Sequence, residues 1–178
     1  KVILDYAHTP DALKTCLLNL REQFPNKLIT VLFGCGGNRD QNKRSQMGKI
    51  ASSFADSIIL TNDNPRFENP QKIIRDIKKG IKKKRIIEIS NRAIAIKQAI
   101  HNLNSGDILL VAGKGHEKIQ DIGNKKIFFS DRKVILNAIK NKNNTLSDNL
   151  KLNVVKEVAK IKKLSPSTSL KKARINSQ

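Results

Sequence analysis

The chain has 178 residues, enough for one domain with an extension, and its core must be aliphatic because only 4% of the residues are aromatic. The formal net charge is +20, but the lysines are scattered and no stacking-aromatic motif accompanies them, which favours a solvated basic surface over a specific nucleic-acid site. No apolar run is long enough to span a membrane, and two cysteines make neither a metal nor a disulfide framework, so we expect a cytoplasmic protein.

The first half of the chain alternates short apolar runs with amphipathic helical patterns. Residues 1–4 predict a strand, and Thr9-Pro10 predicts the start of a helix, since Thr caps helices and Pro suits their first turn. The same reasoning predicts a strand at 28–33, a helix at 43–54, a strand at 57–60 and a helix that starts at Asn69-Pro70.

The second half continues this alternation. The expected elements are a strand at 85–89, a helix from Asn91 to about 103, a strand at 107–112, a hairpin that turns at Gly123-Asn124 and a last helix from Asp131. Strands that alternate with helices at this spacing predict an α/β fold, a Rossmann-like and mostly parallel sheet with helices on both faces. The short return after the turn predicts one antiparallel strand, near 125–129.

Polar loops follow four of the predicted strands, near residues 5–10, 34–40, 61–66 and 113–117. The loops at the carboxyl ends of parallel strands meet at one edge of a sheet, where such folds bind ligands. We therefore expect these four loops to form one site.

The loop after residue 60 offers a carboxylate, an amide and a guanidinium in Asp63, Asn64 and Arg66. This set could hold both an ammonium and a carboxylate, as an amino acid requires. The alternative is an Asx-turn with one exposed arginine.

Two glycine-containing loops offer further charged groups. Arg39 is a fork for a carboxylate or phosphate, or else the partner of Asp40 or Asp63 in a salt bridge. Lys114 could meet a phosphate and Glu117 an ammonium, although a Gly-Lys-Gly sequence is also common in turns. Neither loop has the spacing of a P-loop or of a dinucleotide-binding motif.

The first loop carries Asp5 and His8, which could serve as a base or a metal ligand. The chain has only three histidines, and none has the spacing of a metal site. We expect no metal site and assign no catalytic residue.

Taken together, the motifs resemble those of one family. The motifs are Asp5-Tyr6-Ala7-His8-Thr9-Pro10-Asp11-Ala12, Phe33 to Asp40 with Lys43-Arg44, Asp63-Asn64-Pro65-Arg66 and Ala112 to Glu117. In this order they closely resemble the carboxyl-terminal domain of the Mur ligases, over residues 1 to about 140. The resemblance implies a peptidoglycan-synthesis ligase in which ATP phosphorylates the terminal carboxylate of a UDP-sugar peptide and an amino acid attacks the acyl phosphate.

The family resemblance also implies three domains, of which this chain holds the third. The domains for the UDP-sugar and for ATP with Mg²⁺ would be missing, and the first residue, Lys1, also suggests a piece of a longer polypeptide. The absence of a P-loop is then expected, and the chain alone should not catalyse.

The resemblance also assigns roles to residues. The positions that bind the amino acid in the meso-diaminopimelate-adding members, which use UDP-MurNAc-L-Ala-D-Glu, are matched by Arg39, Asp63, Asn64, Pro65, Arg66, Gly113 and Glu117. Arg66 would clamp the distal carboxylate, while Glu117 and the backbone at Gly113 would take the distal ammonium. Asp5, His8 and Lys114 would face the nucleotide or the neighbouring domain.

Three alternatives remain open at this point. A lysine-adding ligase would place an ammonium where Arg66 repels it, and a folylpolyglutamate-type ligase would not need the Asp63-to-Arg66 loop. A basic nucleic-acid-binding domain rests on net charge alone.

The last part of the chain has a different composition. Residues 141–150 predict a linker, and residues 151–178 predict either a basic tail or the start of a second, fused Mur ligase amino-terminal domain.

Overall fold

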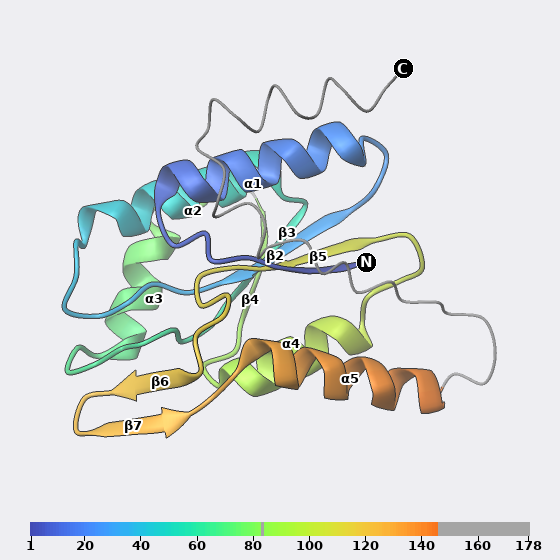
Figure 1. Cartoon of the computed structure of the whole chain (residues 1–178). Coiled ribbons are helices and arrows are strands. Elements are labelled where there is room, and N and C mark those ends of the chain that lie inside the picture. The colour runs from blue at the N-terminus through green and yellow to red at the C-terminus, as the bar shows by residue number, and fades with distance from the viewer. Residues whose placement is uncertain (83, 146–178) are drawn as a thin grey trace, which may run out of the picture.

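The computed structural model describes residues 1–82 and 84–145 and shows a parallel sheet between two layers of helices (Figure 1). Within these ranges the main sheet has five strands, all parallel, in the order β1-β5-β2-β3-β4. The strands are β1 (Val2–Leu4), β2 (Ile29–Phe33), β3 (Ser57–Leu60), β4 (Arg85–Glu88) and β5 (Ile108–Val111). The predicted α/β fold is confirmed.

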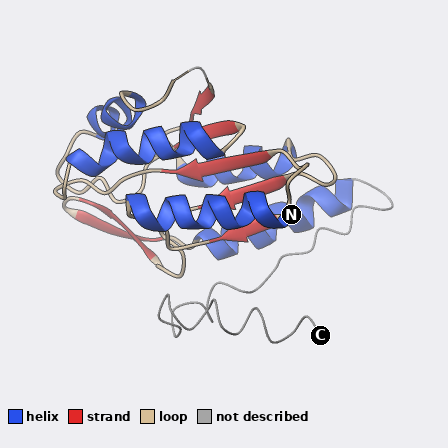
Figure 2. Cartoon of the chain, turned by 90° about the horizontal axis from the view of Figure 1, so that it is seen from above, coloured by secondary structure: helices blue, strands red, loops and turns tan. Residues whose placement is uncertain are grey.

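The helices cover both faces of the sheet, as the views from the side and from above show (Figures 1 and 2). One face packs against α1 (Pro10–Gln23), α2 (Asn42–Phe54) and α3 (Pro70–Lys78), and the other against α4 (Arg92–His101) and α5 (Asp131–Thr145). Alternate strand residues enter the two cores: Val31 and Phe33 join the first, and Leu32 joins the second. This alternation explains why the central strands read as continuous apolar runs.

Three helices begin where capping residues predict. The side chain of Thr9 accepts a hydrogen bond from the Ala12 backbone N–H, while Asn69 and Asn91 cap α3 and α4 in the same way. Pro10 and Pro70 occupy the first helical positions, where the missing N–H has no cost. The three strand-to-helix junctions are therefore encoded locally.

The predicted antiparallel strand lies outside the main sheet. It is β7 (Lys125–Phe128), which pairs with β6 (Ile119–Ile122) in a separate two-stranded sheet. Because the turn between the two strands is short, β7 pairs with β6 directly before it and not with a strand of the main sheet. Gly123 provides the positive φ of 68° that the turn requires.

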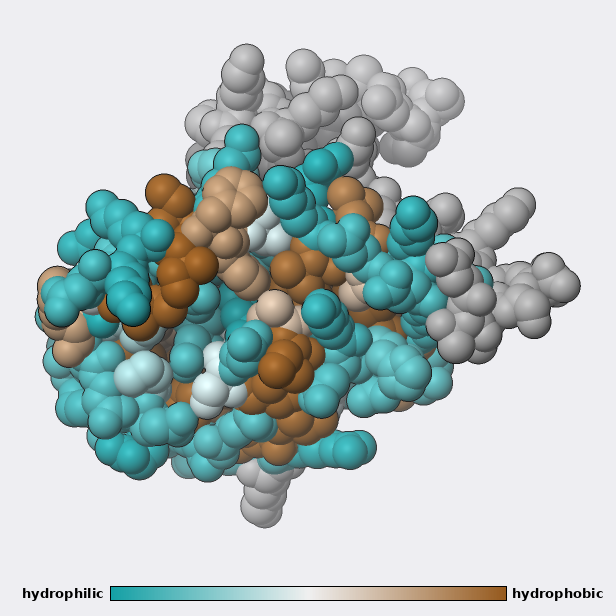
Figure 3. Space-filling model, turned by 90° about the horizontal axis from the view of Figure 1, so that it is seen from below, coloured by the Kyte–Doolittle hydropathy of each residue, from teal (hydrophilic) through white to brown (hydrophobic). Residues whose placement is uncertain are grey.

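This hairpin buries little apolar surface. Exposed apolar side chains are visible from below (Figure 3), and those of the hairpin are Ile119, Ile122, Ile127 and Phe128. Hydrogen bonds attach the hairpin to residues 61–66 instead: the Arg66 N–H donates to the Asp121 carbonyl at 3.0 Å, and Gln120 Nε2 donates to the Asp63 carbonyl at 2.7 Å. The hairpin is therefore positioned by the loop that follows β3.

Helix α5 extends through the first five residues of the expected 141–150 linker and ends at Thr145. Lys142 explains the extension, because its buried ammonium donates to the carbonyls of Ile100 and His101 at the end of α4, at 2.9 and 3.0 Å. The remainder of the linker and the predicted tail or fused domain, residues 146–178, lie outside the described residues. In the ranges that are described, no helix is both long and apolar enough to cross a membrane.

Candidate functional site

The structure brings the four polar loops together at the carboxyl edge of the sheet. The Gly37 N–H donates to the Asn64 carbonyl at 2.9 Å, which joins the second loop to the third. A Cβ added at Gly113 would lie 2.8 Å from Asp63 Oδ2, and one added at Gly115 would lie 2.9 Å from Tyr6 Cβ. These approaches join the fourth loop to the third and the first, so the predicted clustering is confirmed.

The centre of the cluster is a hydrogen-bonded group of Asn64, Lys114 and Glu117. Lys114 Nζ donates to Asn64 Oδ1 at 2.9 Å, to Glu117 Oε2 at 2.8 Å and to the Ile119 carbonyl at 2.7 Å. Asn64 Nδ2 also donates to Glu117 Oε2, at 3.0 Å. The Lys114 side chain is 0% exposed, so its ammonium faces protein on every side.

The pKa values of two carboxylates at this edge of the sheet are shifted in opposite directions. Burial raises the pKa of Asp63 above its usual range, although the charges of Arg92 and Lys114 oppose the shift. Burial would also raise the pKa of Glu117, but the hydrogen bonds from Lys114 and Asn64 outweigh it and hold this pKa below its ordinary value. Within residues 1–82 and 84–145 the Asp63 carboxylate accepts no hydrogen bond.

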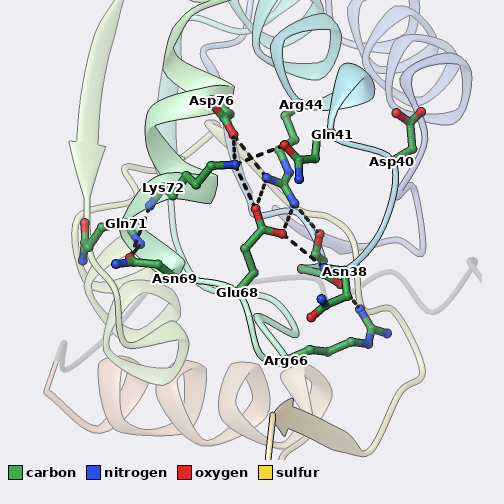
Figure 4. Close-up of polar contacts among 12 residues, drawn as sticks. Asn38, Asp40, Gln41, Arg44, Arg66, Glu68, Asn69, Gln71, Lys72 and Asp76 are labelled. Carbon is green, nitrogen blue, oxygen red and sulfur yellow. Dashed lines mark hydrogen bonds and ion pairs between the residues drawn. The ribbon is translucent and has the colours of Figure 1, made fainter.

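Two arginines lie on the neighbouring loops. Arg66, which is labelled in Figure 4, donates from Nη1 to the Gly37 carbonyl at 2.8 Å. Its Nε lies 3.7 Å from Asp121 Oδ2. Arg39 is exposed and makes no ion pair or hydrogen bond with any described residue, so the alternative salt bridges to Asp40 and Asp63 do not form there. Both side chains pass close to Gly36, where an added Cβ would lie 2.9 Å from Arg66 Nη1 and 3.7 Å from Arg39 Cγ.

A buried ion cluster, which we call the Arg44 clamp, consists of Arg44, Glu68 and Asp76. The two terminal nitrogens of Arg44 each lie 2.6 Å from an oxygen of Glu68, and Nη1 lies 3.2 Å from Asp76 (Figure 4). The hydrogen bonds from Arg44 hold the pKa of Glu68 at about 2, and those from Lys79 and Arg44 hold the pKa of Asp76 at about 2.

The Arg44 clamp fixes the two arginine-bearing loops to each other. Arg44 Nη2 donates to the Gly36 carbonyl at 3.3 Å, and Glu68 Oε2 accepts from the Asn38 N–H at 3.2 Å. The sequence analysis assigned no role to Arg44. Its burial could have been inferred from helical spacing, because Arg44 lies three and seven residues before Met47 and Ala51 on the buried face of α2.

A second buried pair supports the loop after β5. Arg92 and Asp131 both have side chains that are 0% exposed. Arg92 Nε donates to Asp131 Oδ1 at 2.8 Å, and Arg92 Nη2 donates to Asp131 Oδ2 at 2.7 Å. Arg92 Nη2 also donates to the Ala112 carbonyl at 2.9 Å, directly before Gly113. The pairing joins the first residue of α4 to the first residue of α5, and no local sequence signal identifies the partner.

The first loop lies beside the Gly115 turn. Asp5 Oδ1 accepts from the Ala7 N–H at 2.7 Å, and the exposed His8 ring lies 4.4 Å from the Tyr6 ring. The centroid of the His116 ring lies 5.3 Å from the centroid of the same Tyr6 ring. Across the described ranges, no group of three or more His, Cys, Asp or Glu residues could hold a metal ion.

Comparison with known families identifies this arrangement. The family model described as Mur ligase, glutamate ligase domain, matches residues 1–115, which include every loop described above up to Gly115. The chain belongs to the Mur ligase family. The parallel sheet with its helices and separate hairpin is the form that the Mur ligase domain takes here.

Individual Mur ligases similar to the chain are named UDP-N-acetylmuramoyl-L-alanyl-D-glutamate–2,6-diaminopimelate ligase. The protein from Rickettsia rickettsii is 53% identical over 140 residues, which are 78% of this chain and 29% of the relative. The protein from Buchnera aphidicola subsp. Baizongia pistaciae (strain Bp) is 53% identical over 144 residues, which are 80% of this chain and 28% of the relative.

A solved structure of a ligase with the same name superposes with a TM-score of 0.75 at 42% identity, covering 79% of this chain and 29% of that one. The chain therefore spans less than a third of the length of each of these three relatives.

Proposed function

We propose that this chain is the amino-acid-binding domain of an ATP-dependent ligase that adds meso-diaminopimelate to UDP-MurNAc-L-Ala-D-Glu. The observation that carries the proposal is the pairing of opposite charges at one edge of the sheet. The side chains of Arg39 and Arg66 both pass close to Gly36, whereas Asp63 lies against Gly113 and Glu117 is paired with Lys114. A ligand that carries both carboxylates and ammonium groups fits this distribution, and relatives about half identical to the chain are named for diaminopimelate.

The proposed contacts follow from the chemistry of each group. Diaminopimelate has an amino-acid head at both ends, so its distal carboxylate requires a cation where lysine has none. The guanidinium of Arg66 provides a planar fork for that carboxylate, and Arg39 is unpaired in the described structure and available for the other one. The distal ammonium would lie between Asp63 and Glu117, beside the backbone of Gly113 and close to Pro65.

This arrangement argues against a lysine-adding ligase. Lysine ends in an ammonium alone, which would meet the Arg66 guanidinium without a carboxylate between them. Like charges at contact distance are unfavourable, most of all where solvent is excluded. We therefore assign selectivity for diaminopimelate to Arg66.

The other substrates would be held mainly by the two domains that lie outside this chain. ATP, with Mg²⁺, supplies the phosphoryl group that activates the terminal carboxylate of the UDP-sugar dipeptide. Asp5 and His8 would face the nucleotide from the rim of the site, where His8 is exposed. The chain by itself, without a P-loop, should not turn over ATP, which a phosphate-release assay on purified chain would check.

Steady-state kinetics of the full-length ligase would test the assignment of Arg66. Truncating one partner of a desolvated charge pair costs roughly 2–5 kcal/mol, so Arg66→Ala should lower kcat/KM for diaminopimelate by tens- to thousands-fold. Arg66→Lys should recover only part of this, because an ammonium cannot make the planar double contact. The KM values for ATP and for the UDP-sugar dipeptide should change little.

Arg75 provides the matched control, since it is an exposed arginine on α3 away from the loops. Arg75→Ala should behave as wild type with all three substrates. The assignment would be wrong if the wild-type enzyme used L-lysine as well as meso-diaminopimelate, or if Arg66→Ala left the preference between them unchanged.

A further inference from the structure

We propose that Lys114 is a positioning residue that fixes the orientation of Asn64 and Glu117 in the amino-acid site, and that it does not contact the nucleotide. This inference rests on the proposed function, and it changes the role expected from the sequence. It also identifies which buried group determines the geometry of the ammonium-binding side of the site.

The ammonium of Lys114 is inaccessible to a nucleotide. A lysine that meets a phosphate must present Nζ to the ligand, but the Lys114 side chain is 0% exposed. Its ammonium has three hydrogens and makes three hydrogen bonds, to Asn64, Glu117 and the Ile119 carbonyl, all between 2.7 and 2.9 Å. No donor capacity remains for a nucleotide phosphate.

Lys114 also orients the side-chain amide of Asn64. Its Oδ1 accepts from Lys114 Nζ and from the Asp121 N–H, at 2.9 and 3.0 Å, so both neighbours on that side are donors. The amide nitrogen must therefore point the other way, and it donates to Glu117 Oε2 at 3.0 Å. A flipped amide would place N–H groups against two donors, so Lys114 helps to select one orientation.

Lys114 also holds the carboxylate of Glu117 in place. Its Oε2 accepts hydrogen bonds from both Lys114 and Asn64, and these two bonds fix the position of that oxygen. The Tyr6 hydroxyl also donates to this carboxylate, and the side chain remains 31% exposed, so a ligand can still reach part of it. Because the carboxylate is held in place before a ligand binds, less conformational entropy is lost on binding.

Lys114 also balances the charge of the two acids in the site. Asp63 and Glu117 bring two carboxylates, and Lys114 is the ammonium that interacts with both of them. The nearby Arg92 is neutralised by its own partner, Asp131. These three site residues therefore carry one net negative charge when both acids are ionised, which a single ligand ammonium would neutralise.

The experiment measures the KM of each substrate in the full-length ligase that carries Lys114→Met. Losing the buried donor should raise KM for diaminopimelate by roughly tens- to thousands-fold, the scale for truncating one partner of a buried charge pair. The KM values for ATP and for the UDP-sugar dipeptide should stay near wild type. A rise in KM for ATP, with diaminopimelate unaffected, would overturn the inference and restore the contact with the nucleotide.

A double-mutant cycle separates positioning from a general loss of stability. If Lys114 acts through Glu117, Lys114→Met combined with Glu117→Gln should raise KM by less than the product of the two single effects. Independent effects would multiply and would contradict the inference. Should Lys114→Met fail to fold by circular dichroism, Lys114→Gln carries the same test, because it removes the charge and keeps two N–H donors on a side chain one bond shorter than lysine.

The matched control is Lys118→Met, since Lys118 is exposed and lies four residues further along the same segment. It should leave all KM values unchanged. The wild-type enzyme distinguishes the two proposals: no turnover of diaminopimelate refutes the proposed function itself, whereas normal turnover with a Lys114→Met enzyme that is unchanged refutes only the role of Lys114.

Discussion

Replacing Arg44 by methionine should destabilise the domain by about 3 kcal/mol, because it removes the cation of a buried ion cluster. Arg44 is 0% exposed, and its carboxylate partners Glu68 and Asp76 are 12% and 14% exposed, so water can replace the lost contacts only in part. Breaking a buried pair in this way costs roughly 3–5 kcal/mol. We take the lower end because Lys72 remains 3.3 Å from Glu68 and 3.5 Å from Asp76 and compensates in part.

Thermal and urea unfolding of the chain, followed by circular dichroism, would measure this loss. For a protein of this size, about 3 kcal/mol corresponds to a fall in Tm of roughly 6–12 °C. The matched control is Lys78→Met, which breaks an ion pair to Glu88 whose two side chains are each 40% exposed and which should cost less than about 1 kcal/mol. If Arg44→Met cost no more than this control, the Arg44 clamp would not be a stabilising element.

Three further variants or conditions test other parts of the structure. Gly37→Ala should separate the two arginine-bearing loops, because its Cβ would lie 1.9 Å from the Pro65 carbonyl oxygen; we expect a lower Tm and, in the full-length ligase, a lower kcat/KM for diaminopimelate. Arg92→Met should leave Asp131 buried without its cation and lower the free energy of unfolding by roughly 3–5 kcal/mol, measured in urea. Acid should weaken the fold: the pKa of Glu68 falls from 4.5 to about 2 on folding, so its contribution is complete above pH 4.5 and is lost as the pH falls toward 2. A urea midpoint that did not change between pH 5 and pH 2.5 would contradict that assignment, and Arg44→Met should reduce the change.

The helix starts and the site loops were predictable because their signals are local. Thr9-Pro10 and Asn69-Pro70 carry the cap and the first-turn proline within two residues, and both helices begin there. The clustering of the four loops followed from one general property of parallel sheets, which holds whatever the order of the strands.

The buried charges were not predictable, because their partners come from distant parts of the chain. Arg44 and Glu68 are separated by 24 residues, and Arg92 and Asp131 by 39. Lys114 lies between two glycines, a setting typical of an exposed turn, and its burial depends on Asn64, fifty residues away, and on the hairpin carbonyl of Ile119. Sequence patterns identify which residues carry charge, but not which charges the fold encloses.

The position of β5 in the sheet has a consequence for how the domain is made. β5 lies between β1 and β2, so Val2 pairs with Leu109 across more than a hundred residues. Within the described sheet, β1 has no other strand beside it. During synthesis, β1 therefore cannot dock in the sheet until residues 108–111 have been added. Until then β2 exposes an unpaired edge, so folding of this domain should be late, and nascent chains that stop short of β5 should be prone to aggregation.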